Sequence, residues 1–89
     1  MSRGILESTV VRAPGIAIVS CRENVGGRSY GPEMWLIKKV RKAAECAFCD
    51  ETILCGSQAY APVSNGYNRM WRGCTRCIVT TTRAASKGA

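Results

Sequence analysis

The chain has 89 residues, of which 46% are hydrophobic, 7% aromatic and 21% charged. This length fits one small domain and leaves no room for a large catalytic cleft. Histidine is absent, which excludes Ser-His-Asp triads, Cys-His pairs and His-ligated catalytic metals. The formal net charge is +7, and all six acidic residues lie at or before Glu51. This balance favours a polyanion or an acidic protein face as partner, or it only keeps a small protein in solution.

The N-terminal part carries strand signals. Residues 8–11 and 16–19 are short runs rich in β-branched side chains, and Ala13-Pro14-Gly15 between them is a turn signal. We therefore expect a β-hairpin here. The segment 24–27, Asn-Val-Gly-Gly, is expected to form a loop.

Residues 34–37 are apolar and run into the basic segment 38–42. We expect a third strand to begin here, with a short amphipathic helix as the alternative. Trp35 and Val40 are candidate core residues in either case.

The N-terminal segment lacks the uninterrupted apolar core of a signal peptide, because Arg3, Glu7 and Arg12 interrupt it. The apolar run 16–19 is far too short to span a bilayer. We expect a cytoplasmic protein, nuclear if eukaryotic, that is not secreted and has no membrane partner. Thiols stay reduced in these compartments, where paired cysteines bind metal more often than they form disulfides.

Four of the six cysteines form two Cys-x2-Cys pairs, Cys46 with Cys49 and Cys74 with Cys77. Two thiolates at this spacing on a tight turn reach the same metal, and two such turns complete a tetrahedral zinc site with bonds of about 2.3 Å. We expect one Zn²⁺, which would leave a net charge of about +5. An iron–sulfur centre is the main metal alternative, and disulfides or a redox Cys-x2-Cys are the other interpretations.

The residues between and after the two pairs predict further elements. Residues 52–54 and 59–61 flank Cys55-Gly56 and are expected to form a hairpin. Asn65-Gly66 is a second turn signal, after which residues 67–71 return toward the second pair.

A helix is expected to begin near Thr75. It would place Ile78, Val79 and Thr82 on one face, against the hairpin.

The pattern C-x2-C-x3-I-x2-G followed by W-x2-C-x2-C covers about a third of the chain and is formed by Cys46, Cys49, Ile53, Gly56, Trp71, Cys74 and Cys77. It resembles the treble-clef zinc fingers of the poly(ADP-ribose) polymerase type and, more loosely, one half of a LIM domain. Those fingers usually have a histidine at the position of Cys74, so the resemblance implies the ligands and not the DNA-break recognition. The compact basic chain with one finger also resembles small phage-encoded regulatory proteins.

These features together predict a small α+β, zinc-stabilised domain, made of β-hairpins and a treble-clef finger that ends in a short C-terminal helix. We expect residues 1–89 to be a single domain. It comprises a β-rich segment over 1–43, the four-cysteine finger over 44–85 and a frayed tail over 86–89.

Several other residues have a structural and a functional interpretation. Cys21 and Cys55 are expected to be buried, inert thiols, with Cys55 as a possible substitute for one ligand. Asp50 and Glu51 are expected to be solvated rather than a catalytic pair. The aromatic residues expected in the core are Trp35, Phe48, Tyr60 and Trp71. Tyr67, after a turn and before Arg69, is the better candidate for stacking on a ligand.

Two functional hypotheses follow, and an enzyme is not expected because no acid–base constellation is present. The first is a protein that binds DNA or RNA, or regulates a nucleic-acid-processing machine, through a basic surface. The second is a protein–protein interaction module that inhibits or adapts a partner enzyme by binding an acidic face of that enzyme. In both, the expected contact residues are Arg69, Arg72, Arg76, Lys38, Lys39, Arg41, Lys42 and Tyr67.

Overall fold

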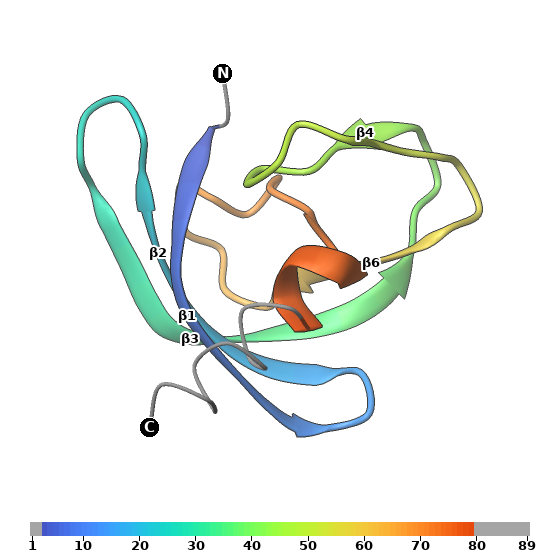
Figure 1. Cartoon of the computed structure of the whole chain (residues 1–89), viewed down its shortest axis with the longest axis horizontal. Coiled ribbons are helices and arrows are strands. Elements are labelled where there is room, and N and C mark those ends of the chain that lie inside the picture. Colours follow the sequence, from blue (N-terminus) through green and yellow to red (C-terminus); the bar gives the residue numbers. More distant parts are fainter. Residues whose placement is uncertain (1–2, 80–89) are drawn as a thin grey trace.

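The computed structural model describes residues 3–79, which form a mostly β structure with a short helix near the C-terminal end (Figure 1). Five strands make one antiparallel sheet in the order β1-β2-β3-β6-β7. Two further strands, β4 (Ala44–Glu45) and β5 (Thr52–Ile53), form a separate small sheet. The strands of the main sheet are β1 (Gly4–Ala13), β2 (Ile16–Glu23), β3 (Ser29–Lys39), β6 (Gln58–Pro62) and β7 (Gly73–Cys74).

The helix begins at Thr75, as predicted, and is described up to residue 79. No helix within residues 3–79 has the length and apolar character needed to cross a membrane.

The predicted N-terminal hairpin is confirmed. β1 and β2 pair antiparallel from Gly4 opposite Glu23 to Ala13 opposite Ile16. Gly15 closes the turn at φ 82°, a conformation that glycine adopts without steric cost. β3 is a strand over its whole length, so the alternative of an amphipathic helix is wrong.

The predicted hairpin of residues 52–54 with 59–61 is wrong. β5 pairs with β4, whereas β6 pairs with β3 and places Leu36 opposite Ala61. Residues 59–62 are all buried. Such a run needs a partner on the inside of the molecule, and the long strand β3 offers it five paired positions. The turn at Gly56, at φ 91°, does form, but it connects the two sheets.

The two edges of the main sheet are connected through the first cysteine pair. The backbone N–H of Gly4 in β1 donates to the carbonyl oxygen of Ala47 (2.8 Å). The N–H of Ala47 donates in turn to the carbonyl oxygen of Arg72, just before β7 (2.8 Å). Because Ala47 lies between the cysteines of the first pair, a metal site there also joins the two edges.

The hydrophobic core fills the space that the curved sheet encloses. Its main cluster comprises Ala17, Val19, Cys21, Trp35, Ala47, Tyr60, Trp71 and Ile78. Phe48 is partly buried against it, and its ring centroid lies 5.8 Å from that of Trp35 and 6.2 Å from that of Trp71. The core role predicted for the four aromatic residues is therefore confirmed.

Within residues 75–79, the described part of the helix, one side chain enters this core. Ile78 is fully buried, and its carbonyl oxygen accepts a hydrogen bond from Thr9 Oγ1 of β1 (2.9 Å). Val79 is 39% exposed, so the prediction that it shares the buried face is wrong. Adjacent helical residues point about 100° apart, which explains the difference. Thr82 and the predicted tail 86–89 lie outside the described residues.

Candidate metal centre

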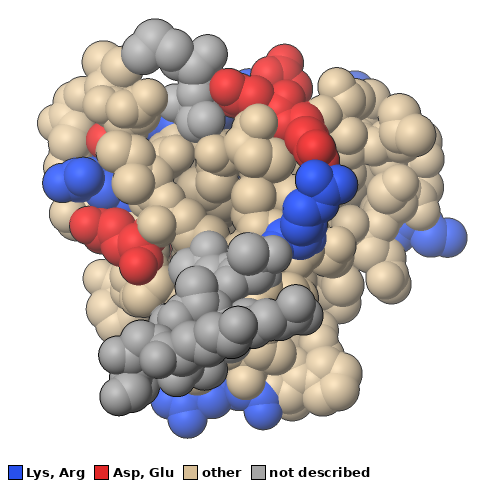
Figure 2. All heavy atoms as spheres, in the orientation of Figure 1, with Lys and Arg blue, Asp and Glu red and all other residues tan. Residues whose placement is uncertain are grey.

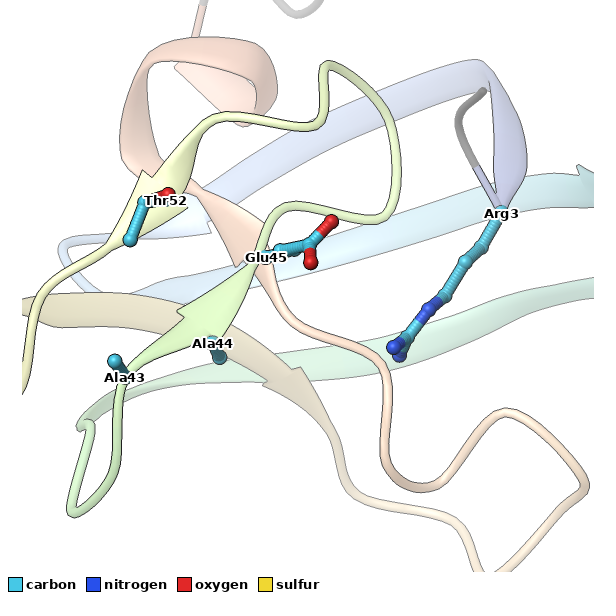
Figure 3. A pocket seen from close by; sticks show the side chains of 5 residues that line it. All are labelled: Arg3, Ala43, Ala44, Glu45 and Thr52. Carbon is cyan, nitrogen blue, oxygen red and sulfur yellow. The ribbon is translucent and has the colours of Figure 1, made fainter.

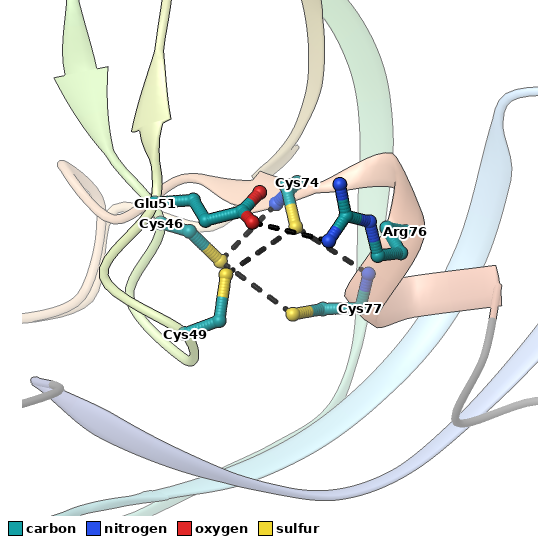
Figure 4. A network of polar contacts seen from close by, with 6 residues as sticks. All are labelled: Cys46, Cys49, Glu51, Cys74, Arg76 and Cys77. Carbon is teal, nitrogen blue, oxygen red and sulfur yellow. Dashed lines mark hydrogen bonds and ion pairs between the residues drawn. The ribbon is translucent and has the colours of Figure 1, made fainter.

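The four paired cysteines converge on one point, as Figure 4 shows. The Sγ atoms of Cys46, Cys49, Cys74 and Cys77 all lie within 4.8 Å of one another. The Sγ atoms of Cys46 and Cys77 are 3.8 Å apart, and those of Cys49 and Cys74 are 3.7 Å apart. The two pairs of atoms share no sulfur, so the two distances are opposite edges of the tetrahedron that the four sulfurs define.

The first pair lies in the loop that joins β4 to β5. The N–H of Cys46 donates to the carbonyl oxygen of Glu51 (2.9 Å), and the N–H of Asp50 donates to that of Cys46 (3.1 Å). Asp50 adopts φ 63°, a left-handed conformation that Asp and Asn tolerate better than most residues. This tight turn brings both thiols to the same side of the loop.

The second pair spans the end of β7 and the first turn of the helix. Cys74 ends the strand, and Cys77 follows three residues later inside the helix. The N–H of Cys77 donates to Cys74 Sγ (3.4 Å), which holds the two side chains toward the same point. The change from strand to helix thus produces the same juxtaposition that the loop produces in the first pair.

Backbone N–H groups are aimed at Cys46 Sγ from both pairs. The donors are the N–H of Phe48 (3.4 Å) and the N–H of Cys74 (3.3 Å). Burial by itself raises the pKa of the Cys46 thiol, but these two N–H donors, together with the N–H and the thiol of Cys49, outweigh it and the pKa is lowered. Such donors stabilise a thiolate and add a direct connection between the two pairs.

In the second pair burial outweighs the N–H donors, and the pKa values of both thiols are raised. Burial raises the pKa of the Cys74 thiol, although the Cys77 N–H donor works against this. It also raises the pKa of Cys77, and the neighbouring thiols raise it further. A bound dication reverses this preference because a coordinating thiol loses its proton outright.

The geometry of the four sulfurs fits a single metal ion. A tetrahedral site with metal–sulfur bonds of about 2.3 Å has sulfur–sulfur edges of about 3.8 Å. The two opposite edges, at 3.8 and 3.7 Å, agree with this value. The four-cysteine cluster is therefore compatible with a bound metal ion, and Zn²⁺ is the ion that such a closed thiolate set suits best.

The two remaining cysteines are far from equivalent. Cys21 is fully buried in the main core, as predicted, and burial raises the pKa of its thiol to about 12, with smaller contributions from Glu33 and Glu7. Cys55 is exposed, so the prediction that it is buried is wrong. Its thiol donates to the carbonyl oxygen of Arg41 (3.0 Å), and it does not belong to the metal-binding cluster.

Asp50 and Glu51 are both exposed, as expected of solvated residues. Glu51 forms an ion pair with Arg76 (3.1 Å), next to the sulfur atoms (Figure 4). Both side chains are largely solvent-exposed, so the pair contributes little to stability. It nevertheless places a carboxylate beside one of the three arginines predicted to bind a partner.

The other predicted contact residues are distributed over two places. Lys38 and Lys39 are exposed at the end of β3, and Arg41 and Lys42 are exposed in the loop that follows. Backbone hydrogen bonds between Val40 and residues 56–57 hold this loop (2.8 Å each). These four cations form no ion pair with any residue in the described part of the chain.

The second place is the segment before β7. Arg72 Nη1 donates to the carbonyl oxygens of Trp71 (2.7 Å) and Arg69 (3.2 Å), so its guanidinium group folds back onto the backbone. Arg69 itself is exposed. Tyr67 is 75% exposed, and the guanidinium carbon of Arg28 lies 4.3 Å from its ring centroid.

The basic side chains do not form one continuous patch on the face shown in Figure 2. Lys and Arg side chains lie there in separate groups, with uncharged surface between them, and one basic group touches an acidic one.

A shallow pocket of about 290 Å³ lies beside the small sheet (Figure 3). Its lining consists of Arg3, Ala43, Ala44, Glu45 and Thr52. Figure 3 shows the Arg3 side chain reaching toward β4, with Glu45 between them. A lone acid, a lone base and one threonine hydroxyl on an open surface form neither an activated nucleophile nor a metal-ligand set, so we assign no catalytic role to this pocket.

Sequence reasoning missed a polar network around Glu33. Its Oε1 accepts hydrogen bonds from Asn68 Nδ2 (2.7 Å) and Trp35 Nε1 (3.2 Å), and its Oε2 accepts one from Ser64 Oγ (2.9 Å). Ser64 and Asn68 belong to the loop between β6 and β7. No spacing or composition in the sequence marks these residues as partners, since they are more than 30 positions apart from Glu33.

A scan against protein-family models and searches of curated proteins and of solved structures found no match for this chain.

Proposed function

We propose that the chain is a zinc-ordered finger of the treble-clef type that binds nucleic acid, DNA or RNA, through exposed basic residues. The order of elements supports the treble-clef assignment. A cysteine loop on β4–β5 comes first, the antiparallel pair β6–β7 follows, and a helix starting at Thr75 carries the last ligand, Cys77. In this proposal Zn²⁺ holds the segments in place and takes no part in chemistry.

The observation that carries the nucleic-acid proposal is the set of unpaired cations at the end of β3 and in the loop that follows it. These are Lys38, Lys39, Arg41 and Lys42, which are exposed and have no carboxylate partner in residues 3–79. Four cations within five residues repel one another, and an anionic partner relieves that repulsion. The spaced phosphates of nucleic acid suit such a row, because each neutralised phosphate releases counterions.

The test is a salt-titrated binding measurement on the zinc-loaded chain, with labelled single-stranded DNA, duplex DNA and RNA of equal length. Replacing the four cations by Gln should lower the slope of log affinity against log salt by about 0.7–0.9 for each phosphate that the chain no longer neutralises. The matched control changes Lys38, Lys39 and Lys42 to Arg, which keeps the charge and should keep the slope. Absence of binding at low salt to all three nucleic acids would refute the proposal.

A protein–protein interaction module that inhibits or adapts a partner enzyme is the second candidate. It is favoured by exposed apolar side chains, which include Val25 (79% exposed), Leu54 (66%) and Met70 (69%). Affinity purification with and without nuclease separates the two, because a direct protein partner is retained after nuclease treatment.

We further propose that the protein acts by binding rather than by catalysis, in the cytoplasm or nucleus. A chain without histidine, whose paired thiols are committed to a metal, has few groups left for acid–base work. A reducing compartment keeps those thiols available to the metal.

A further inference from the structure

The loop between β6 and β7, residues 63–72, buries Trp71 in the core but reverses the usual distribution of polarity just before it. There Asn68 is fully buried, whereas Tyr67 and Met70 are 75% and 69% exposed. A buried amide between two large exposed side chains is the informative feature of this surface. Residues 67–70 therefore present Tyr67 and Met70 outward while Asn68 is buried.

The same loop is held firmly in place. Asn68 Nδ2 and Ser64 Oγ both donate to the carboxylate of Glu33 in β3, at 2.7 and 2.9 Å. Within the loop, the Arg69 N–H donates to the Gly66 carbonyl oxygen (3.0 Å). Because the backbone on either side of Tyr67 is fixed, a ligand that binds the ring loses little free energy to ordering the loop.

A cation already lies against the Tyr67 ring. The guanidinium carbon of Arg28, from the turn between β2 and β3, is 4.3 Å from the ring centroid. Arg28 is exposed and forms no ion pair among residues 3–79. Arg69, also exposed, follows Tyr67 by two positions in the same loop. An accessible aromatic ring with one arginine over it and a second arginine two positions along the same loop, neither of them ion-paired within residues 3–79, suits a ligand that has both a flat π-surface and negative charge.

We propose that Tyr67, Arg28 and Arg69 form a site for an unpaired base of single-stranded nucleic acid. The base stacks on the Tyr67 ring, and the two arginines contact the flanking phosphates. This inference rests on the proposed function and narrows it to a strand whose bases are free. The bases of a duplex are stacked on one another and do not reach a side-chain ring on the surface.

The experiment measures the affinity of the full, zinc-loaded chain for a labelled 15-nucleotide oligothymidine and for a duplex of the same length. Tyr67→Leu keeps an apolar side chain but removes the ring, and should weaken oligothymidine binding about tenfold with an unchanged salt slope. Tyr67→Phe should bind like wild type. Arg28→Gln should lower the salt slope by about 0.7, whereas Arg12→Gln, at an exposed position on β1, should not.

Metal content and thermal unfolding of each variant exclude a trivial loss of fold. Equal loss of single-strand and duplex binding in Tyr67→Leu would overturn the inference, and so would no loss at all. If wild type binds nucleic acid and only the variant lacking the Lys38–Lys42 cations fails, this inference falls while the proposed function stands. If wild type binds an oligo-glutamate peptide but no nucleic acid, both fall.

Discussion

Strands β1, β2 and β3 are 10, 8 and 11 residues long, whereas β4, β5 and β7 have two residues each. In the first region, long ladders of backbone hydrogen bonds and an apolar face fix the register. The second region, residues 44–79, has one longer strand, β6, which pairs with β3, but the strands that flank the cysteines have two residues each. Strands this short cannot fix their own pairing, since even a whole hairpin is marginally stable in water. The four clustered sulfurs, which are compatible with a metal ion, therefore lie where the strands are too short to hold their own pairing.

The two regions are nevertheless not independent. Ala47, Trp71 and Ile78 come from the cysteine-bearing region but lie in the main core with Trp35. Backbone hydrogen bonds also join Gly4 to Ala47 and Ala47 to Arg72. Loss of order in residues 44–79 therefore exposes the core that the three long strands build.

The largest expected effect is that of removing the metal. A strong chelator, or Cys74→Ser, should disorder residues 44–79 and loosen the rest, because structural zinc contributes on the order of 10 kcal/mol in small fingers. Amide chemical shifts with and without chelator report the change residue by residue. Cys55→Ser is the matched control and should leave the spectrum and the metal content unchanged, since Cys55 lies outside the cluster. Native spectra after complete zinc removal would contradict the account.

The second largest effect is expected in the region of the long strands, where a substitution should lower stability without removing the metal. Gly31 adopts φ 96°, and a Cβ added there would collide with the Val19 carbonyl oxygen of the paired strand. Gly31→Ala should lower the free energy of unfolding by about 2 kcal/mol or more while leaving one metal ion bound.

Gly27→Ala is the control for Gly31→Ala. Gly27 has φ 72°, and no atom lies within 4 Å of an added Cβ, so only the backbone cost of about 1 kcal/mol should remain. Denaturant unfolding of the zinc-loaded variants measures both. If the two substitutions lower the free energy of unfolding equally, the close approach of β2 and β3 at Gly31 does not contribute to the destabilisation.

A smaller effect is expected within the first cysteine pair. Asp50 adopts φ 63° in the turn between the two short strands. Asp50→Ala should weaken zinc binding about fivefold, equivalent to about 1 kcal/mol, because alanine tolerates this conformation less well. Asp50→Asn keeps the tolerance and should bind zinc almost as wild type does. Competition with a chromophoric chelator gives the two affinities, and the reverse ranking would contradict the argument.

The last prediction concerns the chemical reactivity of the two cysteines outside the cluster. At pH 8 an alkylating reagent should modify exposed Cys55 quickly and leave Cys21 intact in the folded, zinc-loaded chain. Burial raises the pKa of Cys21 to about 12, so its thiol stays protonated at pH 8 and becomes reactive only as the pH rises toward that value or the chain unfolds. Peptide mass mapping after timed alkylation checks this. Rapid modification of Cys21 would mean that the core is open.

The sequence predicts much of the metal centre and less of the fold around it. The Cys-x2-Cys spacing is local, so Cys46, Cys49, Cys74 and Cys77 could be identified without a structure. The first hairpin and the helix start near Thr75 were also predictable from local features, the turn signal at residues 13–15 and the apolar spacing after Thr75. The partner of β6 could not be predicted in the same way, because its choice between β5 and β3 depends on burial in the assembled core.

The outcome at Glu33 and Tyr67 illustrates the same limit. Tyr67 was identifiable as an exposed ring from the turn signal before it, but nothing in the sequence connects it to Arg28, 39 positions away. The contact arises because the sheet order places the β2–β3 turn near the loop that follows β6. Side-chain interactions between distant loops emerge only once the register of the sheet is known.

We expect four cysteine sulfurs to hold one zinc ion that orders the second region. X-ray absorption at the zinc edge of the purified chain, together with elemental analysis, checks this. The expected result is one zinc per chain surrounded by four sulfur atoms at about 2.3 Å. A first shell that contains nitrogen or oxygen, iron in place of zinc, or a folded chain without metal would contradict it.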